Sequence, residues 1–141
     1  MTSVESVIRC ESVYKIFGAN AEKMLKDADG NVDAQIFQEA GCIVGVNNAS
    51  FDVSRGEMLV VMGLSGSGKS TLLRCASRLT DATSGKIYID GQDLLSLKNK
   101  ELIELRRNKM GMVFQSFALL PHKTVLENIA FPLQIKGIKT K

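Results

Sequence analysis

The chain has 141 residues, of which 45% are hydrophobic and 23% charged, so it fits one domain, or part of one, with a buried core and a polar surface. Lys and Arg number 18 against 15 Asp and Glu, a surplus too small to indicate nucleic-acid binding. Three cysteines without a C-x-x-C pair predict neither a disulfide framework nor a zinc site. No signal peptide is expected, and no stretch approaches the ~18 apolar residues of a membrane span. Any role at a membrane is therefore expected to depend on a partner.

The first third of the chain predicts two strands separated by a helical insertion. Apolar residues over 4–13 indicate a first strand, and the stretch 49–53 indicates a second. The segment 19–41 between them is polar, with helix-like runs on either side of Gly30 and with Gly41 in the place of a helix C-cap. We interpret it as a helical insertion that joins the two strands.

The acidic middle of the insertion spaces its oxygen-bearing side chains like a calcium-binding loop. That loop needs Gly at its sixth position and Glu at its twelfth. Counted from Asp27, those positions hold Val32 and Gln38. The sequence therefore favours a solvated acidic turn.

A glycine-rich segment follows the apolar run 58–62, which predicts a buried strand. The segment fits G-x-x-x-x-G-K-[ST] at every fixed position, and the apolar stripe over 70–79 predicts an amphipathic helix directly after it. Successive N–H groups at a helix start bind phosphates, and glycines let the chain curl around them. The predicted nucleotide-binding residues are Gly63, Leu64, Ser65, Gly66, Ser67, Gly68, Lys69, Ser70 and Thr71.

Three side chains of this segment have predicted roles toward ATP and Mg²⁺. Lys69 reaches the β and γ phosphates as a point charge, and the Ser70 hydroxyl ligates Mg²⁺ together with nucleotide oxygens. Thr71 lies where its N–H and hydroxyl serve the α phosphate. The loop indicates nucleotide binding but not the reaction. A GTPase is disfavoured because the nearest match to [NT]-K-x-D, at 108–111, lacks the aspartate.

Three further elements are predicted downstream of the loop. Residues 84–91 form a short strand closed by an Asp-Gly turn. Residues 99–107 form a helix, and 110–114 form a strand. This strand delivers Gln115 at its carboxyl end, where ligands bind in open α/β sheets.

The last predicted element is a helix that begins at a capping box. Thr124 is followed three residues later by Glu127, which is the pattern of this cap. The helix is predicted to continue through Phe131, and Pro132 is expected to end or kink it because proline lacks an N–H.

Three segments together resemble the ATP-binding subunit of ABC importers: GLSGSGKSTLLR at 63–74, SGKIYIDG at 84–91 and MVFQSFALLPHKTVLENIAFPL at 112–133. The inserted segment and the run MGLSGSGKSTLLRCASRL with FQSFALLPH make the chain most similar to the importers of glycine betaine, proline betaine, choline and similar osmolytes. The resemblance implies an α/β P-loop NTPase fold of the ABC ATPase type, with a RecA-like core and an antiparallel β subdomain. Residues 1–141 would then be the N-terminal part of a nucleotide-binding domain, incomplete at its C-terminus.

The resemblance also implies roles for residues outside the loop. Gln115 matches the Q-loop glutamine, which ligates Mg²⁺ beside Ser70, positions the attacking water and moves with the membrane subunit. Phe17 matches the aromatic residue that stacks on adenine, with Tyr14 three residues away as the alternative. His122, the only histidine, is expected to pack at a surface or interface and not to act as a base.

The segment 116–131 resembles the region that receives a coupling helix of the membrane subunit. This would explain exposed apolar side chains such as Phe117, Leu119 and Leu120. The partners implied are transmembrane permease subunits, a second ATPase subunit in a head-to-tail homodimer and, indirectly, an external substrate-binding protein, with no nucleic acid. The protein is then expected at the cytoplasmic face of the inner membrane, as a peripheral subunit that couples ATP binding and hydrolysis to osmolyte transport.

The family hydrolyses ATP with a signature motif, a Walker B aspartate followed by a glutamate, and a switch histidine. None of these occurs in the 141 residues, so no catalytic residue is assigned. Because phosphoryl transfer depends on positioning and charge stabilisation, these residues alone are expected to hydrolyse ATP negligibly. The alternative interpretation is a truncated, non-catalytic nucleotide-binding protein or remnant.

Overall fold

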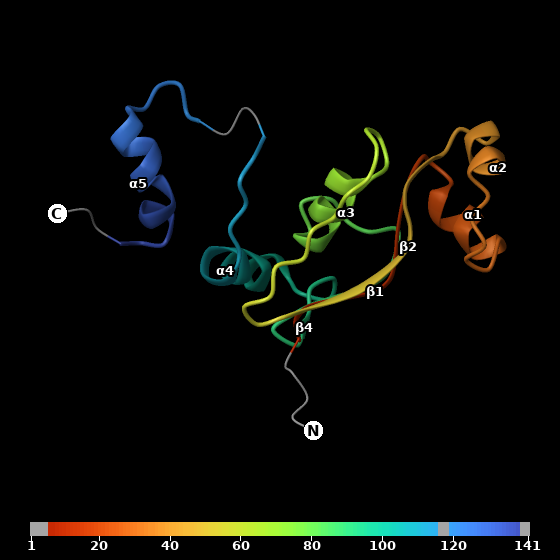
Figure 1. Cartoon of the computed structure of the whole chain (residues 1–141), viewed down its shortest axis with the longest axis horizontal. Coiled ribbons are helices and arrows are strands. Elements are labelled where there is room, and N and C mark those ends of the chain that lie inside the picture. Colours follow the sequence, from red (N-terminus) through yellow and green to blue (C-terminus); the bar gives the residue numbers. More distant parts are fainter. Residues whose placement is uncertain (1–5, 116–118, 139–141) are drawn as a thin grey trace. The chain divides into compact units, whose positions relative to one another are not determined.

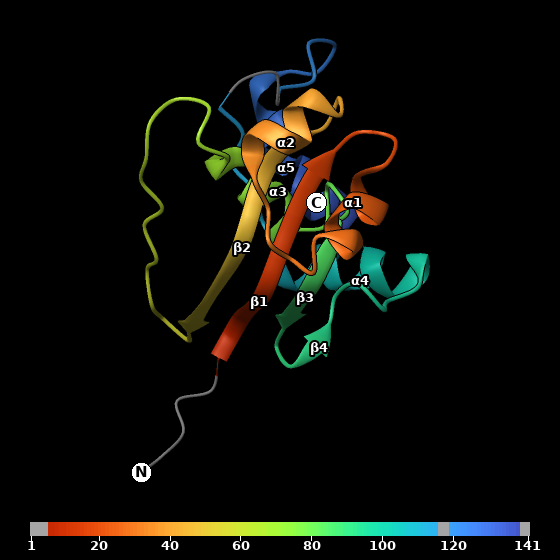
Figure 2. The ribbon, with the colours of Figure 1, turned by 90° about the vertical axis from the view of Figure 1, so that its right-hand side faces the viewer.

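The computed structural model describes residues 6–115 and 119–138, and the chain forms two compact units, Met1–Leu97 and Lys98–Lys141. The first unit contains β1 (Ser6–Phe17), α1 (Ala21–Asp27), α2 (Ala34–Glu39), β2 (Ile43–Ser54), α3 (Lys69–Ala76), β3 (Ser84–Ile89) and β4 (Gln92–Asp93). The second contains α4 (Asn99–Lys109) and α5 (Val125–Ile135). Figure 1 labels these elements except β3, which is labelled in Figure 2. No helix of the described residues is both long and apolar enough to span a membrane.

The first unit is built on an antiparallel sheet with strand order β2-β1-β3-β4 (Figure 2). The central strand β1 pairs with β2 on one side and β3 on the other, so Arg9 lies between Asp52 and Tyr88. Its guanidinium lies 4.5 Å from the centroid of the Tyr88 ring. Such cross-strand pairs stabilise a sheet. Both predicted strands are confirmed, and pairing extends them to Phe17 at the end of β1 and Ile43 at the start of β2.

The segment 19–41, interpreted as a helical insertion, contains the helix pair α1 and α2. Asp33 begins α2, with a side chain that accepts hydrogen bonds from the N–H groups of Gln35 and Ile36. Gly41 follows the C-cap of α2 with a φ of 75°, as expected of the residue after a helix. The two helices pack against the end of β1 in a hydrophobic core made of Tyr14, Ile16, Ala21, Leu25, Phe37 and Cys42.

The Tyr14 hydroxyl connects β1 to the turn between the two insertion helices, because it donates a 3.1 Å hydrogen bond to the Gly30 carbonyl. Tyr14→Phe is expected to lower the free energy of unfolding by about 1 kcal/mol, the usual net contribution of one such bond. Urea denaturation measures this change. Tyr88→Phe is the matched control, since the Tyr88 hydroxyl makes no hydrogen bond within the described part of the chain. Equal stability of Tyr14→Phe and wild type would contradict the prediction.

Two predicted strands are wrong. Residues 58–62 and 110–114 are not strands in the structure, and most of their side chains are exposed, with Met58 at 87% and Val113 at 97%. Figure 2 shows the first of these segments, in yellow-green, as part of an open loop outside the sheet. An extended segment becomes a strand only when its N–H and C=O groups pair with a neighbour. No strand of the described residues pairs with either segment.

The two helices of the second unit begin where their caps predict. The Lys98 N–H bonds the Glu101 carboxylate at 2.8 Å before α4, which buries Leu102 and Leu105. The capping box at Thr124 is confirmed before α5. The helix does not end at Pro132, as one alternative had it, but continues to Ile135. A proline inside a helix lacks one hydrogen bond and crowds the carbonyl four residues before it, yet α5 continues beyond Pro132 for three residues.

The Glu127 carboxylate accepts hydrogen bonds from the Thr124 N–H at 2.7 Å and from the Thr124 hydroxyl at 2.9 Å. These bonds, the backbone one first, hold the pKa of Glu127 below its ordinary value. We therefore expect the cap to stabilise α5 fully above the pKa of an unfolded-state glutamate and to be lost as the pH falls through the lower folded pKa. An NMR titration of the Glu127 carboxyl measures this. Thr124→Ala should move the pKa back upwards, and an ordinary or raised pKa in wild type would contradict the prediction.

Candidate functional site

The predicted phosphate-binding residues lie in one continuous turn at the start of α3. Gly68 is the N-cap of this helix, with a φ of 87°. The first N–H groups of a helix, here those of Lys69, Ser70 and Thr71, have no intrahelical acceptor and carry the positive end of the helix dipole. In the described residues no side chain caps α3. The donors are therefore available to an anion such as a phosphate group.

The Lys69 side chain folds over the loop. Its ammonium donates hydrogen bonds to the carbonyl oxygens of Gly63 at 2.9 Å and Leu64 at 2.6 Å, and lies 3.3 Å from the Ser67 hydroxyl. These acceptors are neutral. A phosphate oxygen would be a stronger acceptor for the same ammonium, because charge-assisted hydrogen bonds are stronger.

The loop packs directly on β2 through two glycines. A Cβ atom on Gly68 would lie 2.0 Å from the Gly45 carbonyl oxygen. A Cβ atom on Gly45 would lie 2.9 Å from Cε2 of Phe17 and 3.1 Å from the Thr71 methyl. Gly45 therefore allows the loop, the first turn of α3 and the Phe17 ring to meet. A cavity of about 360 Å³ lies between β2 and the loop, lined among others by Gly45, Ser67 and Lys69.

The structure separates the two candidate aromatic residues. Phe17 is the last residue of β1, beside Gly45, and its side chain is 42% exposed. Tyr14 is only 9% exposed and belongs to the core of the insertion. A ring must present a free surface to stack on a base, so the geometry favours Phe17.

The two predicted Mg²⁺ ligands lie in different units. Ser70 is exposed in the first turn of α3, and a hydroxyl oxygen there suits Mg²⁺, which prefers oxygen ligands and shares them with phosphates. Gln115 is exposed in the second unit, directly after the extended segment 110–114. Its role beside Ser70 remains a prediction.

The predicted docking region for a membrane subunit is partly described. Phe117 lies outside the described residues, whereas Leu119 and His122 are exposed. The helix α5 presents Val125, Leu126 and Ile129 to the surface. A small cavity of about 290 Å³ between Leu119 and Ile129 adds to this apolar surface. Leu119 is exposed as expected, whereas Leu120 is half-buried.

The buried cysteines are poor nucleophiles. Burial, reinforced by Asp52 and Cys75, raises the pKa of the Cys10 thiol to about 11. Burial also raises the pKa of Cys75 on α3, an effect that the Lys15 charge opposes. A thiol reacts as its thiolate, so these side chains serve the core.

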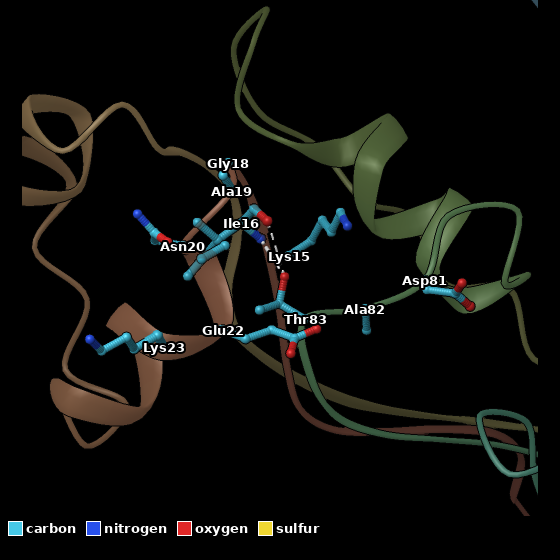
Figure 3. Close-up of a pocket in the computed structure, with 11 residues that line it drawn as sticks. Lys15, Ile16, Gly18, Ala19, Asn20, Glu22, Lys23, Asp81, Ala82 and Thr83 are labelled. Atoms are coloured by element: carbon cyan, nitrogen blue, oxygen red, sulfur yellow. Dashed lines mark hydrogen bonds between the residues drawn. The ribbon is translucent and has the colours of Figure 1, made fainter.

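A second cavity, of about 480 Å³, lies where β1 leads into α1 (Figure 3). Thr83 fixes one wall, because its hydroxyl accepts a hydrogen bond from the Ile16 N–H at 2.9 Å and lies 3.1 Å from the Ile16 carbonyl oxygen. Lys15 also lines this cavity. In Figure 3 its side chain extends toward α3, away from Lys23.

The sequence analysis did not predict Lys15 and Gly45 as residues of the candidate nucleotide site. A sequence pattern could have indicated each of them. A glycine between two valines inside a strand indicates the close approach of another backbone. A lysine two residues before an aromatic residue in a strand shares its face.

Comparison with known proteins decides the family. Residues 46–141 match the ABC transporter family. The chain belongs to the ABC transporter family. Its fold is that of a solved ATP-binding cassette, a dimer in a post-hydrolysis state bound to ADP and Pi, with a TM-score of 0.73 at 32% identity over 95% of this chain and 50% of that one. The expected α/β fold of the ABC ATPase type is thereby confirmed.

Several relatives are ATP-binding proteins of transport systems. The chain is 85% identical over 137 residues to the trimethylamine N-oxide transport system ATP-binding protein TmoW of Pelagibacter ubique, covering 97% of this chain and 40% of that protein. It is 57% identical to TmoW of Ruegeria pomeroyi, covering 93% of this chain and 38% of that protein. It is 44% identical to the glycine betaine/proline betaine protein ProV of Escherichia coli, covering 95% and 34%. The chain thus spans less than half the length of these relatives.

Proposed function

We propose that this chain is the front part of the ATP-binding subunit of an ABC importer, in which ATP binding and hydrolysis drive the uptake of a small methylated-amine osmolyte. The observation that carries the proposal is the phosphate-binding turn, which packs on β2 through Gly45 and Gly68 and leaves the first N–H groups of α3 available. The family membership and the names of the relatives support it.

Different residues of the site are proposed to bind different parts of the nucleotide. Lys69 and the N–H groups of α3 bind the phosphates, and Phe17 stacks on the adenine. Ser70 would hold Mg²⁺, which when bound neutralises phosphate charge, and Gln115 is the second proposed ligand. The residues of the composite dimer site that complete hydrolysis would come from the rest of the protein and from a second ATPase subunit. An importer also requires permease subunits, for which the exposed apolar residues of α5 form a docking surface at the cytoplasmic face of the membrane.

The names of the relatives favour a different substrate from the one that the resemblance implied. The resemblance implied glycine betaine, proline betaine or choline, but the two relatives with 85% and 57% identity are named for trimethylamine N-oxide. Trimethylamine N-oxide and glycine betaine both combine a methylated nitrogen with a negative oxygen. We propose trimethylamine N-oxide first and glycine betaine second. The residues at the site suit a nucleotide, so substrate choice falls to the permease and the external binding protein.

Uptake of labelled trimethylamine N-oxide tests the proposal in a strain that lacks the gene. The wild-type gene should restore uptake, a Lys69→Ala gene should not, and an excess of glycine betaine should compete. Uptake that persists without the gene, or with Lys69→Ala, would overturn the proposal. The intact mass of the native product tests the truncated alternative, because a mass of 15.4 kDa, that of this chain, would limit the function to nucleotide binding.

A further inference from the structure

We infer that Lys15 is a positioning residue of the nucleotide site, which holds the Phe17 ring in place as the stacking surface for the base. The inference rests on the proposed function, because it needs a nucleotide at this site. It concerns how the ring is held and adds no contact between Lys15 and the phosphates.

The first support is the position of the Lys15 ammonium. It lies 4.9 Å from the centroid of the Phe17 ring, within the range of a cation–π interaction. Lys15 and Phe17 are two residues apart in β1 and so share a face of the strand. No carboxylate of the described residues lies within salt-bridge distance of Lys15. The ring is therefore the partner that the structure gives to this charge.

The second support is what lies at the edge of the ring. Gly45 on the neighbouring strand leaves room for the Cε2 edge of Phe17, and the Thr71 methyl approaches the same point. The Lys15 side chain extends toward α3, the helix that begins at the loop (Figure 3). The ring is bounded by Lys15 and by Gly45, yet 42% of the side chain remains exposed.

A ring fixed before binding costs less entropy to order when the base arrives. Removing the cation should free the ring and weaken only the interactions that involve the base. A lysine that instead attracted the phosphates would act on any polyphosphate. If Lys15 positions the ring, its loss should weaken the binding of ATP only. If it attracted the phosphates, its loss should weaken the binding of ATP and of a polyphosphate without a base alike.

The test measures dissociation constants of the intact gene product for Mg-ATP and for inorganic triphosphate. Lys15→Met should weaken ATP binding about twofold to fivefold, the range for an exposed cation–π pair, and leave triphosphate binding unchanged. Lys15→Arg should retain ATP binding. Lys23→Met is the matched control, because Lys23 lines the same cavity from α1. If Lys15→Met fails to fold, Lys15→Gln replaces it.

A double-mutant cycle with Phe17→Ala completes the test. Phe17→Ala should weaken ATP binding, and adding Lys15→Met to it should have no further effect. Equal losses for ATP and triphosphate, or additive losses in the cycle, would overturn the inference. A wild-type protein that binds neither ligand would instead overturn the proposed function, so the two failures are distinguishable.

Discussion

Lys69→Ala is expected to weaken ATP binding by at least about tenfold, because hydrogen bonds to charged groups each contribute about 1.5–3 kcal/mol. The Lys69 ammonium donates hydrogen bonds to oxygens of Gly63, Leu64 and Ser67, in the loop that precedes α3. The substitution removes the one side-chain cation of the loop sequence and leaves the backbone donors in place. Residual binding should therefore come from the N–H groups of α3.

Isothermal titration with Mg-ATP measures this loss. The control is Lys86→Ala in β3, which changes the net charge equally at an exposed position away from the loop. It should bind ATP as wild type does. If the two variants bind ATP equally well, Lys69 is not the phosphate lysine and the assignment of the loop fails.

Gly68→Ala is expected to lower both stability and ATP binding, because its Cβ would lie 2.0 Å from the Gly45 carbonyl oxygen. Neither backbone can give way without moving the loop off β2. The φ of 87° adds the strain of a left-handed conformation, about 1–2 kcal/mol for a residue with a Cβ. ATP binding should fall at least tenfold, about 1.4 kcal/mol or more, because the first N–H groups of α3 move with the loop.

Gly56→Ala is the matched control for this substitution. Gly56 has a similar φ of 79°, but a Cβ there would meet nothing within 4 Å. It should incur the conformational strain alone and bind ATP normally. Urea denaturation and titration with Mg-ATP compare the two variants. Equal behaviour would mean that the contact between Gly68 and Gly45 does not hold the loop in place.

The parts of the fold that local signals determine were predictable from the sequence. The loop from Gly63 to Ser70, the insertion and the cap at Thr124 each depend on residues close together in the chain. The predicted strands at 58–62 and 110–114 failed because strand formation depends on a distant partner, which a local pattern cannot supply. The same reason explains why β1 extends to Phe17, since pairing with Ile43 carries it there.

The candidate site follows the same division. Its predicted motif residues follow from a local pattern, whereas the close approach of Gly68, Gly45 and the Phe17 ring joins segments far apart in sequence. The choice between Phe17 and Tyr14 needed their burial, which depends on how the insertion packs. Spacing along the chain could not provide it.

Alternate residues at the end of β1 serve two different purposes, the packing of the insertion and the proposed nucleotide site. Tyr14 and Ile16 belong to the core of the insertion, while Lys15 contacts the Phe17 ring that is proposed to stack on the base. A shift of one residue in this strand would exchange the two sets. Insertions and deletions in this stretch would therefore harm the packing of the insertion and the nucleotide site at once.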